Sequence, residues 1–228
     1  MGNAIAVDFV TRTRTDAPPK KPRDHTRDRS ALHRAPVDPA AVEALKKRLA
    51  RERSEEGRRS YAMLLLLLTT GMRASELVRL TRSDFRRDDQ GHVLSFYRPK
   101  VKSRHVIRLS EETHRKIKRA LDAYHKAAGL KGKDSEHIFW SAQNRRAGLE
   151  VYVHHTKLTT RSLQRIVNAW GLIDGRGKLL APHALRHHVG RNVSRKKDFI
   201  YAQKLLGHSD PKTTAEFYTD KSVQALEV

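Results

Sequence analysis

The feature of this chain that most constrains its fold is the apolar run Tyr61-Ala-Met-Leu-Leu-Leu-Leu-Leu68. The run has eight residues, whereas a helix that spans a membrane needs about 20. A helix that is apolar on every side must be covered by other elements of the same domain. The run therefore predicts a buried core helix, which we place at about 57–69.

Apolar spacing before and after this helix predicts the rest of the architecture. Val42, Leu45 and Leu49 recur at helical spacing behind Asp38 and Pro39, a residue pair suited to cap and start a helix. Alternation over 92–97 and β-branched residues over 105–109 predict a small antiparallel sheet with its turn at 99–104. Further helices are predicted over 72–82, 111–128, 160–170, 182–194, 199–206 and 213–218. The fold class is thus mainly α with a small antiparallel β-sheet.

The charge of the chain points to a polyanionic partner. Lys and Arg number 47 against 25 Asp and Glu, which gives a net charge of 47 − 25 = +22. Nucleic acid is the usual partner of such a surface, although charge alone fits a non-catalytic basic protein equally well. The chain has no cysteine, which excludes disulfides, cysteine zinc fingers and thiol catalysis and agrees with a cytosolic protein.

The N-terminal stretch differs from the rest in composition. Residues 11–36 hold eight Lys or Arg, three Asp and four Pro, with few large apolar side chains. Such a segment buries too little surface to offset its ordering entropy. We expect residues 1–35 to form a mobile basic tail, which either follows DNA or is a solvated leader, and residues 36–228 to form one folded domain.

Four short motifs carry residues suited to chemistry on a phosphodiester. In chain order they are Gly71-Met-Arg-Ala-Ser-Glu-Leu77, His183-Ala-Leu-Arg186, Leu206-Gly-His208 and the single Tyr218. A guanidinium fork matches two phosphate oxygens at once, and a phenol becomes a useful nucleophile when a base or a neutralised electrophile is present. Each motif alone is weak evidence in so basic a chain, but the four motifs together in this order are strong evidence for chemistry on a phosphodiester.

These motifs resemble those of the tyrosine recombinase (phage-integrase-like) family, whose catalytic domain is similar to this chain from about Pro36 onward. The resemblance implies that family's catalytic-domain fold and a site-specific recombinase that cleaves and rejoins DNA through a 3′-phosphotyrosine, in integration, excision or inversion. It implies double-stranded DNA as partner, a homotetramer on DNA, no cofactor or metal, no membrane or small-molecule substrate, and a cytoplasmic, nucleoid-associated location. The family's separate core-binding domain is not found, so the chain resembles single-domain members or a catalytic fragment.

The resemblance also assigns roles to residues. Arg73 and Arg186 would clamp the scissile phosphate, His183 would bind it and act as base, and His208 would donate to it. A lysine at the sheet turn would protonate the leaving 5′-oxygen. The family pattern places it at Lys100, with Lys102 as the alternative because strand alternation puts both on one face.

Local geometry adds three expectations about these side chains. His183 and Arg186 should share a helix face, with His187 and His188 directed elsewhere. We also expect Arg73 in the first turn of its helix, where a cation beside the positive end of the helix dipole favours a phosphate ligand.

Tyr218 would be the nucleophile, but its spacing departs from the common pattern. It stands ten residues after His208, and the usual ninth position is Phe217, which has no hydroxyl. We interpret this as a one-residue shift that presents Tyr218, with Tyr201 as a distant second candidate. The alternatives are a catalytically silent DNA-binding regulator of the same fold and a type IB topoisomerase-like activity.

Overall fold

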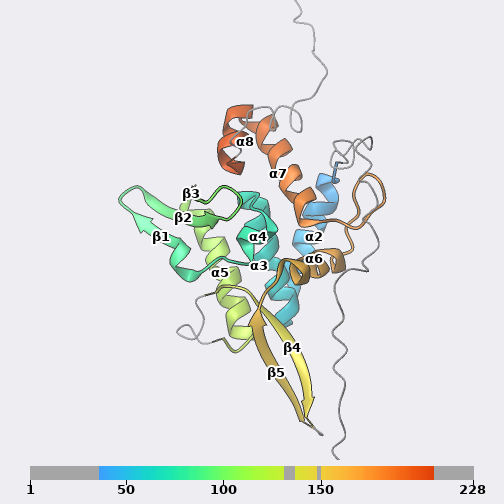
Figure 1. The fold of residues 1–228 in the computed structure, drawn as a ribbon. Coiled ribbons are helices and arrows are strands. Elements are labelled where there is room, and N and C mark those ends of the chain that lie inside the picture. The colour runs from blue at the N-terminus through green and yellow to red at the C-terminus, as the bar shows by residue number, and fades with distance from the viewer. Residues whose placement is uncertain (1–35, 131–136, 148–149, 208–228) are drawn as a thin grey trace, which may run out of the picture.

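The computed structural model describes residues 36–130, 137–147 and 150–207, and for 142–147 and 150–155 it describes the backbone alone. The expected tail at 1–35 and the expected helix at 213–218 lie outside these residues. The elements, in chain order, are α2 (Pro39–Arg51), α3 (Glu55–Thr70), α4 (Ala74–Leu77), the 3₁₀ turn η1 (Arg82–Asp84), β1 (Phe85–Asp88), β2 (Gly91–Arg98), β3 (Ser103–Leu109), α5 (Glu111–Ala127), β4 (Trp140–Ala147), β5 (Glu150–Lys157), α6 (Thr160–Ala169), α7 (Pro182–Lys196) and α8 (Phe199–Leu206) (Figure 1).

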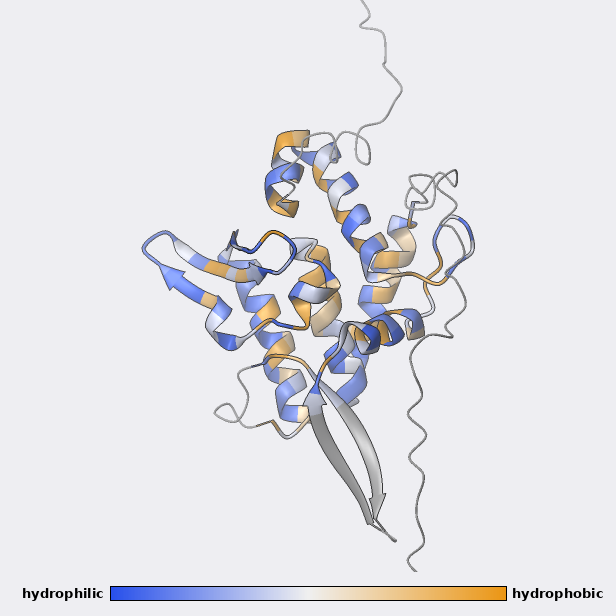
Figure 2. Cartoon of the chain, in the orientation of Figure 1, coloured by the Kyte–Doolittle hydropathy of each residue, from blue (hydrophilic) through white to orange (hydrophobic). Residues whose placement is uncertain are grey.

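Helix α3 is the buried helix that the apolar run predicts. Its leucines at 64, 66 and 67 are at most 1% exposed, and α2, α5 and α7 pack around it. The side chain of Ser54 caps its start by accepting from the Gly57 amide at 3.1 Å, and Gly71, at φ +61°, ends it. Figure 2 shows hydrophobic residues on the inner helices, while the β1–β2 hairpin is mostly hydrophilic.

Helix α2 is the helix that the sequence predicts behind Asp38 and Pro39. The Asp38 carboxylate accepts from the Ala40 amide at 2.9 Å, and a proline occupies the first turn. Its three predicted apolar residues, Val42, Leu45 and Leu49, are buried in the main core. Helices α5, α6, α7 and α8 also lie where the sequence predicts them, within two residues at each end.

The predicted antiparallel sheet is present, with strand order β1-β2-β3. In the β2–β3 pair, Leu94 faces Ile107 and Arg98 faces Ser103, so the hairpin turn is only 99–102. The sequence did not indicate β1, whose four residues are mostly polar and pair with the first half of β2.

The predicted helix over 72–82 is wrong, because α4 ends at Leu77. Beyond it the backbone pairs with a distant segment instead. The Leu80 carbonyl accepts from the Ile138 amide at 3.0 Å, and Thr81 forms an isolated antiparallel bridge with His137. This long-range pairing overrides the local helical pattern.

A second sheet, β4–β5, was not predicted. It is a two-stranded antiparallel ribbon that projects from the helical body (Figure 1). At its base the Trp140 amide donates to the Tyr124 hydroxyl at 3.2 Å, and Arg59 donates to the Trp140 carbonyl at 3.1 Å. Among the described helices, none is long and apolar enough to cross a membrane.

Candidate active site

Arg186 is the point at which three of the four motifs meet. From α7 its Nη1 donates to the Gly71 carbonyl and its Nη2 to the Leu206 carbonyl, both at 2.7 Å. The side chain is 3% exposed. One guanidinium thus joins the end of α3, two residues before Arg73, to the end of α8, two residues before His208.

Close backbone approach at this junction requires glycine. Gly71 lies in the left-handed region at φ +61°, and a Cβ there would stand 2.4 Å from Leu206 Cδ2. Gly207 also has positive φ, +60°, and a Cβ there would stand 2.2 Å from Arg98 Nη1. A side chain at Gly71 would therefore press against Leu206 of α8, and one at Gly207 would displace the Arg98 guanidinium.

Arg73 lies at the N-cap of α4 in extended backbone, not in its first turn as expected. Glu76 binds it twice: its carboxylate accepts from the Arg73 amide at 2.7 Å and from the guanidinium at 2.9 Å. The buried Glu76 carboxylate therefore pairs with the Arg73 guanidinium, for which the sequence indicated a phosphate as ligand. The Arg73 side chain remains 22% exposed, so its outer face is accessible to a ligand.

Arg98, at the end of β2, is a buried arginine that the sequence analysis missed. Its Nε lies 3.7 Å from Glu76 Oε1, and its Nη2 donates to the Gly207 carbonyl. Burial lowers the pKa of this guanidinium, a shift that the Glu76 charge opposes and the Arg73 charge adds to. Glu76 thus lies between two guanidiniums, and Arg98 reaches both the first and the third motif.

His105, on β3, is the second residue that sequence reasoning missed. Its Nε2 donates to the Leu205 carbonyl at 2.9 Å. Burial lowers the pKa of the His105 imidazole, with further lowering from Arg98 and Arg186 and partial opposition from the bond to Leu205. No pattern in the sequence marks His105 or Arg98, because both act through backbone carbonyls about 100 residues away along the chain.

His183 lies in the first turn of α7, one turn before Arg186, and is exposed. The expectation that His187 points elsewhere is wrong. Its ring packs edge-on against that of His183, with 4.5 Å between ring centroids, because residues four apart on a helix are neighbours. His188 turns away as expected, and its Nε2 contacts Asn192 Nδ2 at 2.9 Å.

The two candidate general acids lie in the hairpin turn. Lys100 and Lys102 are both exposed, and Lys102 has φ +49°. Contrary to our expectation, they do not share one strand face, because β2 ends at Arg98 and β3 begins at Ser103. What the structure adds is the anchoring of this turn: Arg98 and His105 tie its two strands to the last turn of α8.

The structure describes only some of the remaining candidate residues. His208, Phe217 and Tyr218 lie outside the described residues, so their roles stay predictions. Tyr201 is 52% exposed in the first turn of α8, whereas Arg186 binds the last turn of that helix.

One group of metal-ligating side chains lies elsewhere among the described residues. His92, Glu111 and His114 offer ligand atoms within 4.8 Å of one another. The two imidazoles are stacked with 3.6 Å between ring centroids and 8° between their planes, so their lone pairs lie in separate, nearly parallel planes and do not converge on one ion. No residue of the four motifs belongs to this group.

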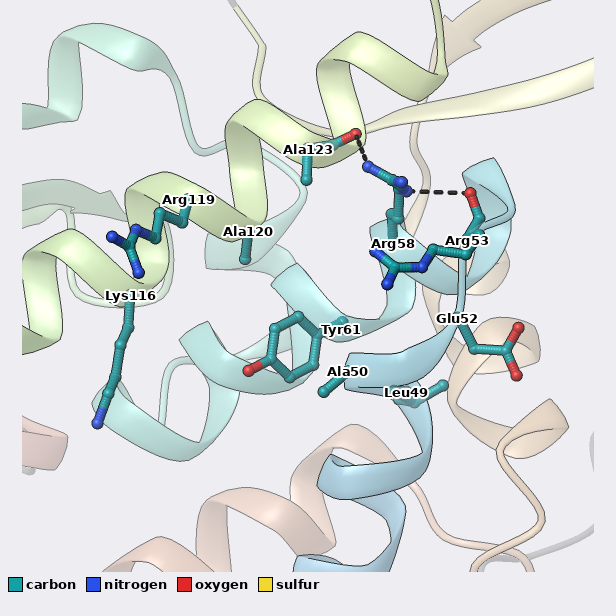
Figure 3. A pocket seen from close by; sticks show the side chains of 10 residues that line it. All are labelled: Leu49, Ala50, Glu52, Arg53, Arg58, Tyr61, Lys116, Arg119, Ala120 and Ala123. Carbon is teal, nitrogen blue, oxygen red and sulfur yellow. Dashed lines mark hydrogen bonds between the residues drawn. The ribbon is translucent and has the colours of Figure 1, made fainter.

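A pocket of about 280 Å³ lies between α2, α3 and α5 (Figure 3). Leu49, Tyr61 and Ala120 contribute apolar surface. Arg58 in its wall donates to the carbonyls of Arg53 and Ala123, as the dashed lines in Figure 3 show. None of the described residues that line this pocket belongs to the four motifs. Three of those motifs meet at Arg186, so we take the Arg186 junction as the candidate site.

Comparison with known proteins identifies the family of the chain. The model of the phage integrase family matches residues 33–225. A tyrosine recombinase XerD from Oceanobacillus iheyensis is 32% identical over 162 residues, which cover 71% of this chain and 50% of that protein. The chain spans about half the length of the curated relatives that it matches.

Solved structures show the same fold. The XerA recombinase has a TM-score of 0.59 at 22% identity over 90% of this chain and 63% of its own. The XerH site-specific recombinase, solved in a post-cleavage complex with a palindromic difH substrate, has a TM-score of 0.58 at 18% identity over 81% of this chain and 49% of its own. The motif order, the junction that joins the motifs and the match over 33–225 lead to one conclusion: the chain belongs to the phage integrase family.

Proposed function

We propose that this chain is the catalytic part of a site-specific DNA recombinase that cleaves and rejoins DNA through a 3′-phosphotyrosine. The observation that carries the proposal is the Arg186 junction. A buried guanidinium brings the segment before Arg73 and the segment before His208 to one point, so that residues more than 100 positions apart can act on one phosphate.

In the proposed reaction, the Tyr218 hydroxyl attacks the scissile phosphorus and loses its proton to His183 or water. The bond from phosphorus to the 5′-oxygen breaks, and Lys100 gives that oxygen a proton, with Lys102 as the alternative donor. Arg73, Arg186 and His208 stabilise charge on the non-bridging oxygens, which is the main task in phosphoryl transfer.

Rejoining reverses these steps with a new strand. A 5′-hydroxyl of the partner duplex attacks the phosphotyrosine and releases Tyr218. Each bond broken is replaced by one of the same kind, so the scheme needs no nucleotide cofactor, and the guanidinium clamp takes the place of a metal. Exchange of four strands needs four active sites, so we propose a homotetramer on double-stranded DNA that acts at the nucleoid.

The proposal also assigns a role to each of two parts of the chain. Residues 36–228 would form the catalytic domain and residues 1–35 a basic segment that follows the DNA backbone. Support comes from the capped start of α2 at Asp38 and from the net charge of +22, which suits a phosphate backbone.

Covalent capture separates this function from a silent DNA-binding regulator. In a nicked suicide duplex, here of randomised sequence, the short fragment that carries the free 5′-hydroxyl diffuses away after cleavage, so the cut strand is not rejoined. We expect a denaturant-resistant protein–DNA adduct that forms equally well with chelator present. A protein that binds these duplexes without forming any adduct would support the regulator instead.

Strand exchange separates it from a type IB topoisomerase-like enzyme. With two differently labelled duplexes that share the captured sequence, a recombinase joins label from one duplex to the other. Relaxation of supercoiled plasmid without any joint product would favour the topoisomerase reading.

A further inference from the structure

The β2–β3 hairpin is fastened to the last turn of α8 from both of its strands. Arg98, the last residue of β2, donates to the Gly207 carbonyl, and His105, on β3, donates to the Leu205 carbonyl at 2.9 Å. Arg186 takes the carbonyl between them, that of Leu206, at 2.7 Å. Three successive carbonyls at a helix end, where the helix itself supplies no donors, are thus bound by the hairpin and by α7.

Arg98 is built into this contact more tightly than an ordinary surface arginine. It is 7% exposed, and its Nη1 would lie 2.2 Å from a Cβ at position 207, so its guanidinium rests on the glycine. Its Nε has no hydrogen-bond partner in the part of the chain that the structure describes, and is held 3.7 Å from the buried Glu76 carboxylate. Burying a guanidinium costs desolvation free energy. The burial of Arg98 therefore indicates that it has a role in this contact.

The lysines of the hairpin turn begin immediately beyond this anchor. Lys100 is two residues from Arg98, a distance of about 7 Å at most along extended backbone. Within the turn, the Val101 amide donates to the Arg98 carbonyl at 3.3 Å, so the turn is built directly on that residue. Both turn lysines are exposed, and a long exposed side chain delivers a proton efficiently only when its backbone is held in place.

We propose that Arg98 and His105 are positioning residues that dock the β2–β3 hairpin on α8 and thereby place Lys100 at the leaving 5′-oxygen. This inference rests on the proposed function and deepens it, because it names the residues that hold the general acid. The imidazole of His105 suits this role, since its burial favours the neutral form whose Nε2 proton is committed to the Leu205 carbonyl.

The test compares two leaving groups in single-turnover cleavage of the captured sequence. One duplex has the natural 5′-oxygen at the scissile bond and the other has sulfur there. A thiolate leaves without a proton, because the pKa of a thiol is about 8.5. A defect in proton delivery therefore slows only the oxygen substrate.

We expect Arg98→Gln to cleave the oxygen substrate about 10²-fold or more slowly, the range in which general acids contribute, and the sulfur substrate at nearly the wild-type rate. His105→Phe, which keeps a ring of similar size but removes the Nε2 donor to the Leu205 carbonyl, should show the same pattern. In Arg98→Gln combined with Lys100→Ala, the oxygen substrate should react no more slowly than in Lys100→Ala alone, since the two residues act in one step.

Arg108→Gln is the matched control. It removes the same charge from β3, where Arg108 pairs with the exposed Asp88 at 3.1 Å, and among the described residues it forms no hydrogen bond or ion pair with α8. Both substrates should react at wild-type rates in this variant.

The inference is overturned if Arg98→Gln or His105→Phe slows both substrates equally, because the effect would then act on the phosphate clamp or on folding. If Arg98→Gln does not fold, His105→Phe decides by the same comparison. A wild-type protein that forms no adduct with either substrate refutes the proposed function itself, whereas normal wild-type cleavage with an equal loss on both substrates refutes only the positioning role.

Discussion

Arg186→Lys tests whether this side chain is both a structural junction and a phosphate clamp. The variant keeps the charge but replaces a planar fork of five donors with a single ammonium. Arg186 now binds the Gly71 and Leu206 carbonyls at 2.7 Å from two different nitrogens, a span that one ammonium does not reproduce. We therefore expect the loss of at least one hydrogen bond.

The size of the effect follows from the chemistry of that bond. A hydrogen bond from a charged donor contributes about 1.5–3 kcal/mol to stability. For a domain of this size each kcal/mol moves Tm by about 2–4 °C, so Arg186→Lys should lower Tm by roughly 3–12 °C. Cleavage should fall further, by about 10²–10³-fold, because one donor to the developing charge is lost as well.

Thermal unfolding followed by circular dichroism measures the first effect, and adduct formation on the suicide duplex, well below Tm, measures the second. Arg195→Lys makes the same chemical change at an exposed position in the last turn of α7 and should shift stability by less than about 0.5 kcal/mol. A Tm of Arg186→Lys equal to that of the wild type would refute the junction. Near-normal cleavage would remove Arg186 from the clamp.

Three further predictions concern the fold and the DNA interface. Gly207→Ala should lower Tm and abolish cleavage, because φ is +60° and the new Cβ would stand 2.2 Å from Arg98 Nη1; unchanged cleavage would show that the close approach is not needed. Burial lowers the pKa of His125, so its neutral form stabilises the fold above about pH 6.5 and this stability is lost as pH falls through that value. In chemical denaturation, His125→Gln should therefore reduce the dependence of the unfolding free energy on pH below about pH 6.5, by at most about 1.4 kcal/mol per pH unit. An unchanged dependence would contradict a lowered His125 pKa. DNA affinity should fall about 10³–10⁵-fold between 50 and 200 mM salt if about six to ten phosphates are neutralised. Deleting residues 1–35 should reduce this salt dependence if the segment contacts DNA. A shallow salt dependence in the intact chain would contradict a basic interface.

Much of the fold could be predicted because it depends on local signals. The apolar run of α3, the cap at Asp38 and the alternation in β2 are each written within a few neighbouring residues. The segment after Leu77 could not be predicted in the same way. Its backbone bonds to residues 137–138, and nothing in its own sequence signals a partner some 60 positions away.

The candidate site divides along the same line. Arg73, His183 and Arg186 stand in recognisable motifs, and the structure brings two of these motifs and the start of the Leu-Gly-His box together. Glu76 was visible in the first motif but had no assigned role, because only the folded chain shows its carboxylate between Arg73 and Arg98. Arg98 and His105 carry no motif at all, since their partners are backbone carbonyls that any residue provides.

The most direct test of the central claim is the identity of the residue that carries DNA in the trapped adduct. Peptide mapping by mass spectrometry, after nuclease and protease digestion, should find the nucleotide on Tyr218. Tyr218→Phe removes one oxygen, so it should still bind the duplex and form no adduct, while the neighbouring Phe217→Leu should form it normally. A nucleotide on Tyr201, or an adduct that persists in Tyr218→Phe, would contradict the account.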